Sequence, residues 1–223
     1  MSSPRLRLLG SSVATKLLIG ITGLALVLYL IVHVVGNLLI FLGPDFFNRY
    51  AYTLEGNPLL PIVEIGLLLV FLIHILRTIR NFVLNQRARP VRYVEKRRAG
   101  WPSRKSFPSS TMIVSGLWLV AFLLVHVKAF RYGAEYPWPA GGRDLYRLEL
   151  ETFRSPLVVA FYAISMVVIG AHLWHGIASG FQSLGADTPA WRRFILPAGK
   201  IVAVAIAGAF IVIAIWAHLQ GAA

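Results

Sequence analysis

Five long apolar stretches alternate with short polar segments along the chain, at residues 16–42, 61–84, 109–130, 156–181 and 197–219. An α-helix rises about 1.5 Å per residue, so each stretch is long enough to cross a hydrocarbon core of about 30 Å. The first stretch is longer than the apolar part of a signal peptide, and we interpret it as a helix. The pattern predicts an all-α integral membrane protein with five transmembrane helices, forming a single membrane domain over residues 1–223.

The composition agrees with this interpretation and narrows the chemistry. Of the 223 residues, 57% are hydrophobic, and the chain contains no cysteine. Thiolate-ligated iron–sulfur clusters, thioether-attached haem and disulfides are therefore excluded. The segments between the apolar stretches are too short to form a water-soluble catalytic domain.

The charge distribution predicts how the helices are oriented. The net charge is +13, and with the N-terminus placed inside, nearly all of the excess positive charge lies on the inner loops and helix ends. Because Lys and Arg gather on the cytoplasmic side of membrane proteins, we expect the N-terminus in the cytoplasm and the C-terminus outside. The expected location is a bacterial cytoplasmic membrane.

The densest basic segment is RARPVRYVEKRRAGWPSRK, at residues 87–105. One interpretation is a topology signal that also contacts anionic lipid head groups. Another is a docking surface for an acidic soluble partner. Nucleic-acid binding is disfavoured, because nothing else in the chain supports it.

All six histidines fall inside or at the ends of the predicted spans: His33, His74, His126, His172, His175 and His218. Ionisable side chains at membrane depth are costly and usually face the interior of a bundle. His33 and His126 lie toward the outer ends of the first and third helices, whereas His74 and His175 lie toward the inner ends of the second and fourth. Two pairs at two depths favour two bis-histidine haems b, held within a bundle of the first four helices. Zinc is disfavoured, because it normally takes three or four ligands at one depth.

The first and third helices share a further pattern. Gly23 follows a threonine and lies ten residues before His33, and Gly116 follows a serine and lies ten residues before His126. Ten residues correspond to about 15 Å of helix, which places each glycine at the level of the inner cofactor. A residue without a side chain lets a porphyrin approach the backbone. Small-residue packing between helices is the alternative interpretation.

The histidine spacing also indicates a weak internal repeat. The first two helices and the next two are similar to two copies of one hairpin, with the fifth helix outside this repeat. We interpret His218, in the fifth helix, as an interfacial residue beside the membrane-surface anchor Trp216.

Four segments carry a resemblance to a known family: TGLALVLYLIVHVVGNL, LLVFLIHILRTIRN, SGLWLVAFLLVHVKAF and HLWHGIASGFQSLGADTPAWRR. In this order and spacing they resemble the di-haem cytochrome b membrane anchor of succinate:quinone oxidoreductases and fumarate reductases, in its single-subunit, five-helix form. The resemblance covers nearly the whole chain.

The resemblance implies a ligand set. His33 and His126 hold the outer haem, and His74 holds the inner one together with the histidine that precedes Gly176. Depth alone does not choose between His172 and His175, which lie one turn apart, and the family's Leu-His-Gly pattern, present here as WHG, selects His175. His172 is then a neighbour of the ligands, a quinone contact or an interior histidine with a partner of its own.

The resemblance also implies partners. A flavoprotein subunit and an iron–sulfur subunit dock on the cytoplasmic face, and the anchor carries electrons between the iron–sulfur subunit and a membrane quinone, menaquinone or ubiquinone. Arg77, Arg80 and Arg131 are candidate partners of haem propionates, although arginines that snorkel to the membrane surface explain them equally well. Glu64 is a candidate for proton transfer to the quinone, with a salt bridge to an outer arginine such as Arg49 as the alternative.

Two other functions fit parts of the pattern. The cytochrome b subunit of another quinone-linked oxidoreductase, of the formate dehydrogenase or hydrogenase type, shares the histidine arrangement and differs in its soluble partners. A haem-free transporter that uses histidines as a proton relay needs no bound cofactor.

Overall fold

The computed structural model describes residues 11–88 and 107–222, and the predicted docking segment at 87–105 lies outside this part of the chain except for its first two residues. In chain order the elements are α2 (Ser12–Leu38), η1 (Leu39–Leu42), α3 (Pro44–Glu55), α4 (Leu60–Arg87), α5 (Phe107–Ser110), α6 (Met112–Phe130), α7 (Leu145–Phe153), α8 (Pro156–Ser183) and α9 (Pro189–Ala222). All of these elements are helices, so the prediction of an all-α protein is confirmed.

Within the described ranges, five helices are long and apolar enough to cross a membrane: Ser12–Leu42, Leu60–Arg87, Met112–Phe130, Pro156–Ser183 and Pro189–Gly221. Each overlaps one of the predicted spans, and the prediction of five spanning helices is confirmed. The last helix begins earlier than predicted, because Pro197 lies inside the helix and not at its start. Proline removes one backbone hydrogen bond, which membrane helices tolerate where neighbouring groups compensate.

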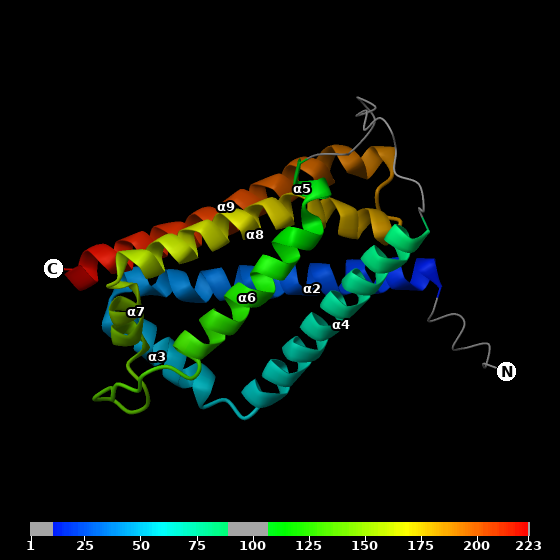
Figure 1. The fold of residues 1–223 in the computed structure, drawn as a ribbon. Coiled ribbons are helices and arrows are strands. Elements are labelled where there is room, and N and C mark those ends of the chain that lie inside the picture. The colour runs from blue at the N-terminus through cyan, green and yellow to red at the C-terminus, as the bar shows by residue number, and fades with distance from the viewer. Residues whose placement is uncertain (1–10, 89–106, 223) are drawn as a thin grey trace.

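Four of the helices form a ring, with the fifth beside it. α2 contacts α4 and α8, and α6 contacts the same two helices, so each member of the ring has two neighbours. α9 runs along α8 and also contacts α2, as Figure 1 shows. We name the two ends of this bundle by the predicted orientation. The outer end contains the last turn of α2 and the first turn of α8, and the inner end contains the last turns of α4 and α8.

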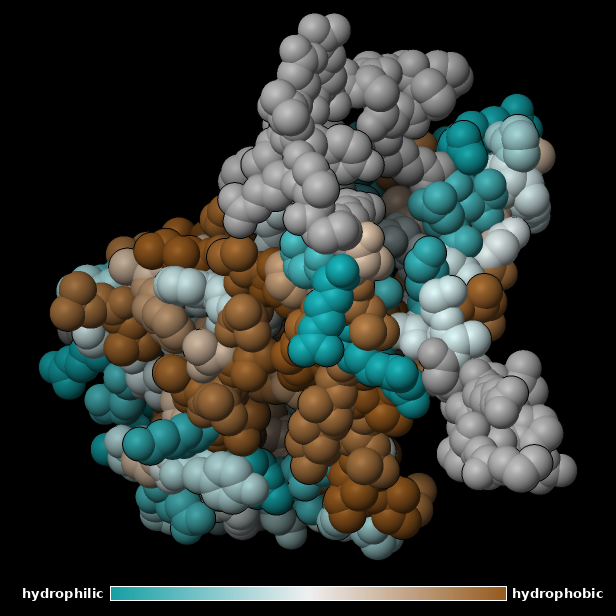
Figure 2. All heavy atoms as spheres, turned by 45° about the vertical axis from the view of Figure 1, so that its right-hand side comes forward, coloured by the Kyte–Doolittle hydropathy of each residue, from teal (hydrophilic) through white to brown (hydrophobic). Residues whose placement is uncertain are grey.

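The outside of the bundle is apolar. None of the 28 residues of α4 is buried, and large side chains such as Leu68 and Leu76 are exposed. Figure 2 shows apolar side chains over much of the middle of one face, with hydrophilic side chains toward its ends. Soluble monomers rarely expose apolar surface of this extent. These faces therefore suit a lipid environment, as expected of a multi-pass membrane protein.

Two short helices that the apolar pattern did not predict, α3 and α7, lie at the outer end (Figure 1). α3 packs against η1 and α7, whereas α7 packs against α9 and also contacts α6 and α8. Both helices are amphipathic, with buried residues such as Phe47 in α3 and Leu148 in α7. They cover the outer end of the bundle without crossing the membrane.

Asn48 joins these two helices. Its side chain has 0% exposure, its Nδ2 donates to Asp144 Oδ1 at 2.7 Å, and its Oδ1 accepts from the Tyr146 N–H at 2.9 Å. Asp144 is in turn the N-cap of α7, because its carboxylate accepts from the Arg147 N–H. One buried amide thus satisfies polar groups on both sides and sets the start of α7 against α3.

Replacing Asn48 with alanine should lower the free energy of unfolding by about 1–3 kcal/mol, because it leaves the buried partners of the amide unsatisfied. The measurement is thermal or denaturant unfolding of the purified protein in detergent. Thr53→Ala, which removes an exposed hydroxyl bonded within its own helix, is the control and should change stability by less than about 0.5 kcal/mol. Equal effects of the two substitutions would show that Asn48 does not hold α3 and α7 together.

Candidate functional site

The structure brings His33 of α2 and His126 of α6 together toward the outer end of the bundle. The centroids of their imidazole rings are 5.9 Å apart, and the rings are nearly perpendicular at 85°. Metal–imidazole bonds are about 2 Å long, so two imidazoles on one metal ion have ring centroids roughly 6 Å apart. The separation of this outer pair fits a metal ion shared between the two rings.

Aromatic rings surround the outer pair. Tyr29 stacks on His33 with ring centroids 5.4 Å apart, and Phe122 stacks on His126 at 5.5 Å. Phe210 of α9 also contacts the His33 ring, at 5.5 Å. His126 Nδ1 is buried and has no hydrogen-bond partner within the described part of the chain. A buried polar atom without a partner is uncommon in folded proteins.

His74 of α4 lies at the inner level and is held by a threonine. Thr22 Oγ1 lies 2.6 Å from the Leu18 carbonyl, to which it donates, and 3.2 Å from His74 Nδ1. The Leu18 carbonyl is the nearer of the two acceptors, and with the hydroxyl proton on that side the hydroxyl oxygen accepts from an Nδ1–H of His74. The other ring nitrogen, Nε2, then carries a free lone pair, which is the form of imidazole that binds a metal.

His172 of α8 has the same kind of contact. Ser115 Oγ lies 2.9 Å from His172 Nδ1 and donates to the Met112 carbonyl at 3.1 Å. With the serine proton on the Met112 carbonyl, His172 has the same tautomer as His74, with Nε2 free. His172 also lies within electrostatic range of both His74 and His175. The inner level therefore contains three histidines, and the serine of the repeated pattern contacts His172.

The two glycines of the repeated pattern lie against these histidines. A Cβ atom at Gly23 would lie 3.1 Å from His74 Cε1, and one at Gly116 would lie 3.6 Å from His172 Cε1. α2 therefore presents Thr22 and Gly23 to α4 in the way that α6 presents Ser115 and Gly116 to α8. The two hairpins thus correspond, but the counterpart of His74 in these contacts is His172, whereas the sequence repeat matches His74 with His175.

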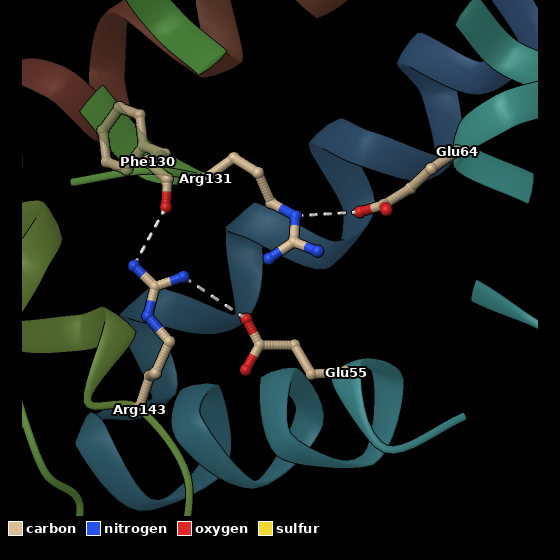
Figure 3. Close-up of polar contacts among 5 residues, drawn as sticks. All are labelled: Glu55, Glu64, Phe130, Arg131 and Arg143. Carbon is tan, nitrogen blue, oxygen red and sulfur yellow. Dashed lines mark hydrogen bonds and ion pairs between the residues drawn. The ribbon is translucent and has the colours of Figure 1, made fainter. Parts of the chain in front are cut away.

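Two of the charged candidates, Glu64 and Arg131, lie at the surface of the outer end. Arg131 Nε donates to Glu64 Oε1 at 3.1 Å, with side-chain exposures of 51% and 42% (Figure 3). Glu64 thus pairs with Arg131 and not with Arg49. At the inner end of α4, Arg77 is half-buried and Arg80 is exposed.

A second arginine, Arg143, connects the segment between α6 and α7 to the neighbouring helices. Arg143 Nη2 donates to the Phe130 carbonyl at 3.2 Å, and its Nη1 lies 3.7 Å from Glu55 Oε1 (Figure 3). This contact ties the segment after α6 to the end of α3.

His218 of α9 is half-buried, and its Nδ1 lies 2.8 Å from the Phe153 carbonyl of α7. It joins α9 to α7.

Sequence reasoning missed two buried polar residues near the outer pair. Glu149 of α7 and Tyr162 of α8 are each 5% exposed. In the segment LELETF, Glu149 resembles the exposed Glu151, and Tyr162 resembles any aromatic residue of an apolar span. No feature of the sequence distinguishes these two residues, because their burial depends on how α7 docks.

Among residues 11–88 and 107–222, no group of three or more His, Cys, Asp or Glu side chains lies close enough together to hold a metal ion. A haem iron needs two axial ligands and not such a group. Comparison with known protein families, with curated proteins and with solved structures finds no match for this chain.

Gly23→Ala tests how tightly α2 lies against His74. The added methyl group would meet His74 Cε1 at 3.1 Å, so the ring or the helix must shift and the melting temperature should fall. Gly66→Ala in α4, where a Cβ meets nothing within 4 Å, is the matched control, and it should leave the melting temperature unchanged or raise it. Thermal unfolding in detergent compares the two. A Gly23→Ala protein as stable as the Gly66→Ala protein would argue against a tight contact.

Proposed function

We propose that this chain is the cytochrome b membrane anchor of a succinate dehydrogenase or fumarate reductase complex. In this proposal it carries electrons between an iron–sulfur subunit and a membrane quinone, menaquinone or ubiquinone, through two bis-histidine haems b. The observation that carries the proposal is the outer pair, in which two helices distant in sequence hold His33 and His126 rings 5.9 Å apart.

Three further observations support two haem sites over one. The Thr22–His74 and Ser115–His172 contacts place a second group of imidazoles at the inner level. The glycines beside these contacts let a flat ligand approach the backbone. α4, which carries His74, has no buried residue, so its inward face is not sealed by protein side chains.

The chain's own residues have three roles in this proposal. Haem b, when bound, supplies one-electron transfer between ferric and ferrous iron. Imidazole nitrogens of His33 and His126 hold the outer haem, and Nε2 of His74 holds the inner one together with His175. The Thr22 hydroxyl fixes the ring orientation of His74. The apolar helices exclude water from the haem sites.

The flavoprotein and iron–sulfur subunits are proposed to dock on the cytoplasmic face. The Arg192 guanidinium at the inner end of α9, which pairs with Asp187 at 3.2 Å, belongs to this face, together with the basic segment 87–105. Arg77 and Arg131 stay candidates for propionate contacts, and Gly23 and Gly116 for haem contacts. The membrane is proposed to be a bacterial cytoplasmic membrane, with the N-terminus inside and anionic lipids around the basic residues.

Haem content tests the proposal most directly. We expect two haems b per chain in the purified membrane complex, measured by the dithionite-reduced pyridine spectrum against protein. His33→Ala and His126→Ala should each remove the same spectral component, and His74→Ala should remove the other. His218→Ala is the control and should keep both. Protein without haem would contradict the proposal and leave a proton relay, and co-purification with formate dehydrogenase or hydrogenase subunits would assign it to a different complex.

The fourth ligand is decided by a pair of substitutions. The resemblance implies His175, so His175→Ala should remove the inner haem, and His172→Ala should keep it with an altered reduction potential. The reverse result would make His172 the ligand, in line with the hydroxyl contact that it shares with His74. Ser115→Ala should then shift the same signal as Thr22→Val. Low-temperature absorption spectra and potentiometric titration measure both effects.

Glu64→Gln tests the proposed proton transfer to quinone. The ion pair with Arg131 is exposed, so its loss should cost less than about 1 kcal/mol of stability. If Glu64 transfers protons, quinone-linked turnover of the complex should fall at least tenfold while the haem content stays the same. Turnover within twofold of the unmodified protein would leave Glu64 with only its surface ion pair.

A further inference from the structure

A groove lies between α8 and α9. The two helices run side by side (Figure 1), and they approach each other closely at Gly170, where an added Cβ would lie 3.0 Å from the Cβ of Ala207. At Gly208, the next residue of α9, an added Cβ would meet nothing within 4 Å. The absent side chain leaves space beside the contact between the helices. The groove has a volume of about 430 Å³, and clefts of roughly 300–1,000 Å³ are usual for small-molecule sites.

This groove is apolar and opens on the side of the bundle that suits lipid. α8 contributes Val167, Gly170 and Trp174 to its lining, and α9 contributes Ala207, Gly208 and Ile211. Val167 is 62% exposed. Along α9 the lining extends from Ala203 to Ile211, which corresponds to about 12 Å of helix. An apolar groove that follows a spanning helix over this length suits a hydrocarbon chain.

A positive charge lies at the inner end of the groove. Nζ of Lys200 is 5.0 Å from the centroid of the Trp174 ring, which belongs to the lining. Lys200 is exposed and precedes Ala203 by about one helical turn. No ion pair joins it to a carboxylate within residues 11–88 and 107–222. Arg193, about two turns earlier on the same side of α9, is also exposed. The inner end of the groove therefore attracts anions.

The inner end of the groove lies at the depth where phospholipid head groups are expected. Pro108 of α5 contributes to the lining. α5 directly precedes the spanning helix α6 and also contacts α8. The groove therefore begins at the level at which α6 enters the bundle. Tryptophan and lysine side chains are both favoured at this boundary, where an apolar body meets a polar surface.

We propose that this groove binds one anionic phospholipid of the inner leaflet, with an acyl chain along Gly170 and Gly208 and its phosphate at Lys200. The acyl chain fills the space that Gly208 leaves open and gains van der Waals contact with both helices. The Lys200 ammonium group attracts the phosphate, and the Trp174 ring holds that ammonium group at the end of the groove. The inference goes beyond the proposed function and does not depend on haem.

Charge favours a lipid over a second copy of this chain as the occupant. Small residues on a membrane helix also suit contact with another helix. Two copies inserted in the same orientation would, however, bring their basic inner ends together at Lys200 and Arg193, and like charges repel. The phosphate of an anionic lipid has the opposite sign, and one lysine near an anionic lipid surface strengthens binding about fivefold.

Lys200→Gln tests the contact with the phosphate. Native mass spectrometry of the purified full-length chain measures the affinity for phosphatidylglycerol and for phosphatidylcholine with the same acyl chains. Lys200→Gln should lower the affinity for phosphatidylglycerol about fivefold and leave that for phosphatidylcholine unchanged. Lys16→Gln is the matched control, because Lys16 is an exposed lysine at the inner end of α2, and it should keep both affinities. Equal losses in the two variants would show only a general attraction of basic residues and would overturn the inference.

Gly208→Leu tests the position of the acyl chain. Leucine fills the open space and favours the helix, so the variant should fold, as thermal unfolding checks, but bind both lipids more weakly. Gly66→Leu in α4, where an added Cβ also meets nothing within 4 Å, is the control and should keep both affinities. Undiminished binding in Gly208→Leu would overturn the inference. A lipid-free dimer that Gly208→Leu dissociates would overturn it too, and would assign the groove to a second copy.

Discussion

A polar group that lies among apolar side chains must find a hydrogen-bond partner or give up its charge, and this constraint shapes the bundle at every level. At the inner level, hydroxyl groups of Thr22 and Ser115 contact both an imidazole ring and a backbone carbonyl of their own helix. At the outer end, the amide of Asn48 serves two partners at once. The Tyr162 hydroxyl and His126 Nδ1 are among the exceptions, because neither has a hydrogen-bond partner within the described residues.

Much of the fold follows from apolar length alone. Twenty or more apolar residues predict a spanning helix whatever its neighbours are, so the five spans are found within a few residues, except where Pro197 marks an apparent start. Apolar length does not predict α3 and α7, because each is short and mixes charged with apolar residues, as a loop also does. Their helical structure depends on docking, since short helices are marginal without tertiary contacts.

The candidate site also has features that the sequence predicts and features that it does not. Depth along a helix is a property of the sequence, so the sequence alone places His33 and His126 at one level, and the fold brings their rings together. The angle at which two helices cross is not such a property. Contact of Ser115 with His172 depends on how α6 crosses α8, and the burial of Glu149 depends on contacts of α7 with α6, α8 and α9.

α3 and α7 also determine the side from which the outer histidine pair is reached. These two helices are held to each other by Asn48, and α7 is held to α9 by His218, so that they cover the end of the bundle at which the outer histidine pair lies. The lateral faces of α2, α4 and α6 are apolar and exposed. In the proposed function, a quinone dissolved in the bilayer would approach the pair from the membrane side, whereas α3 and α7 would keep water-soluble oxidants at a distance. In that function, the covering helices would select the redox partner by its solubility.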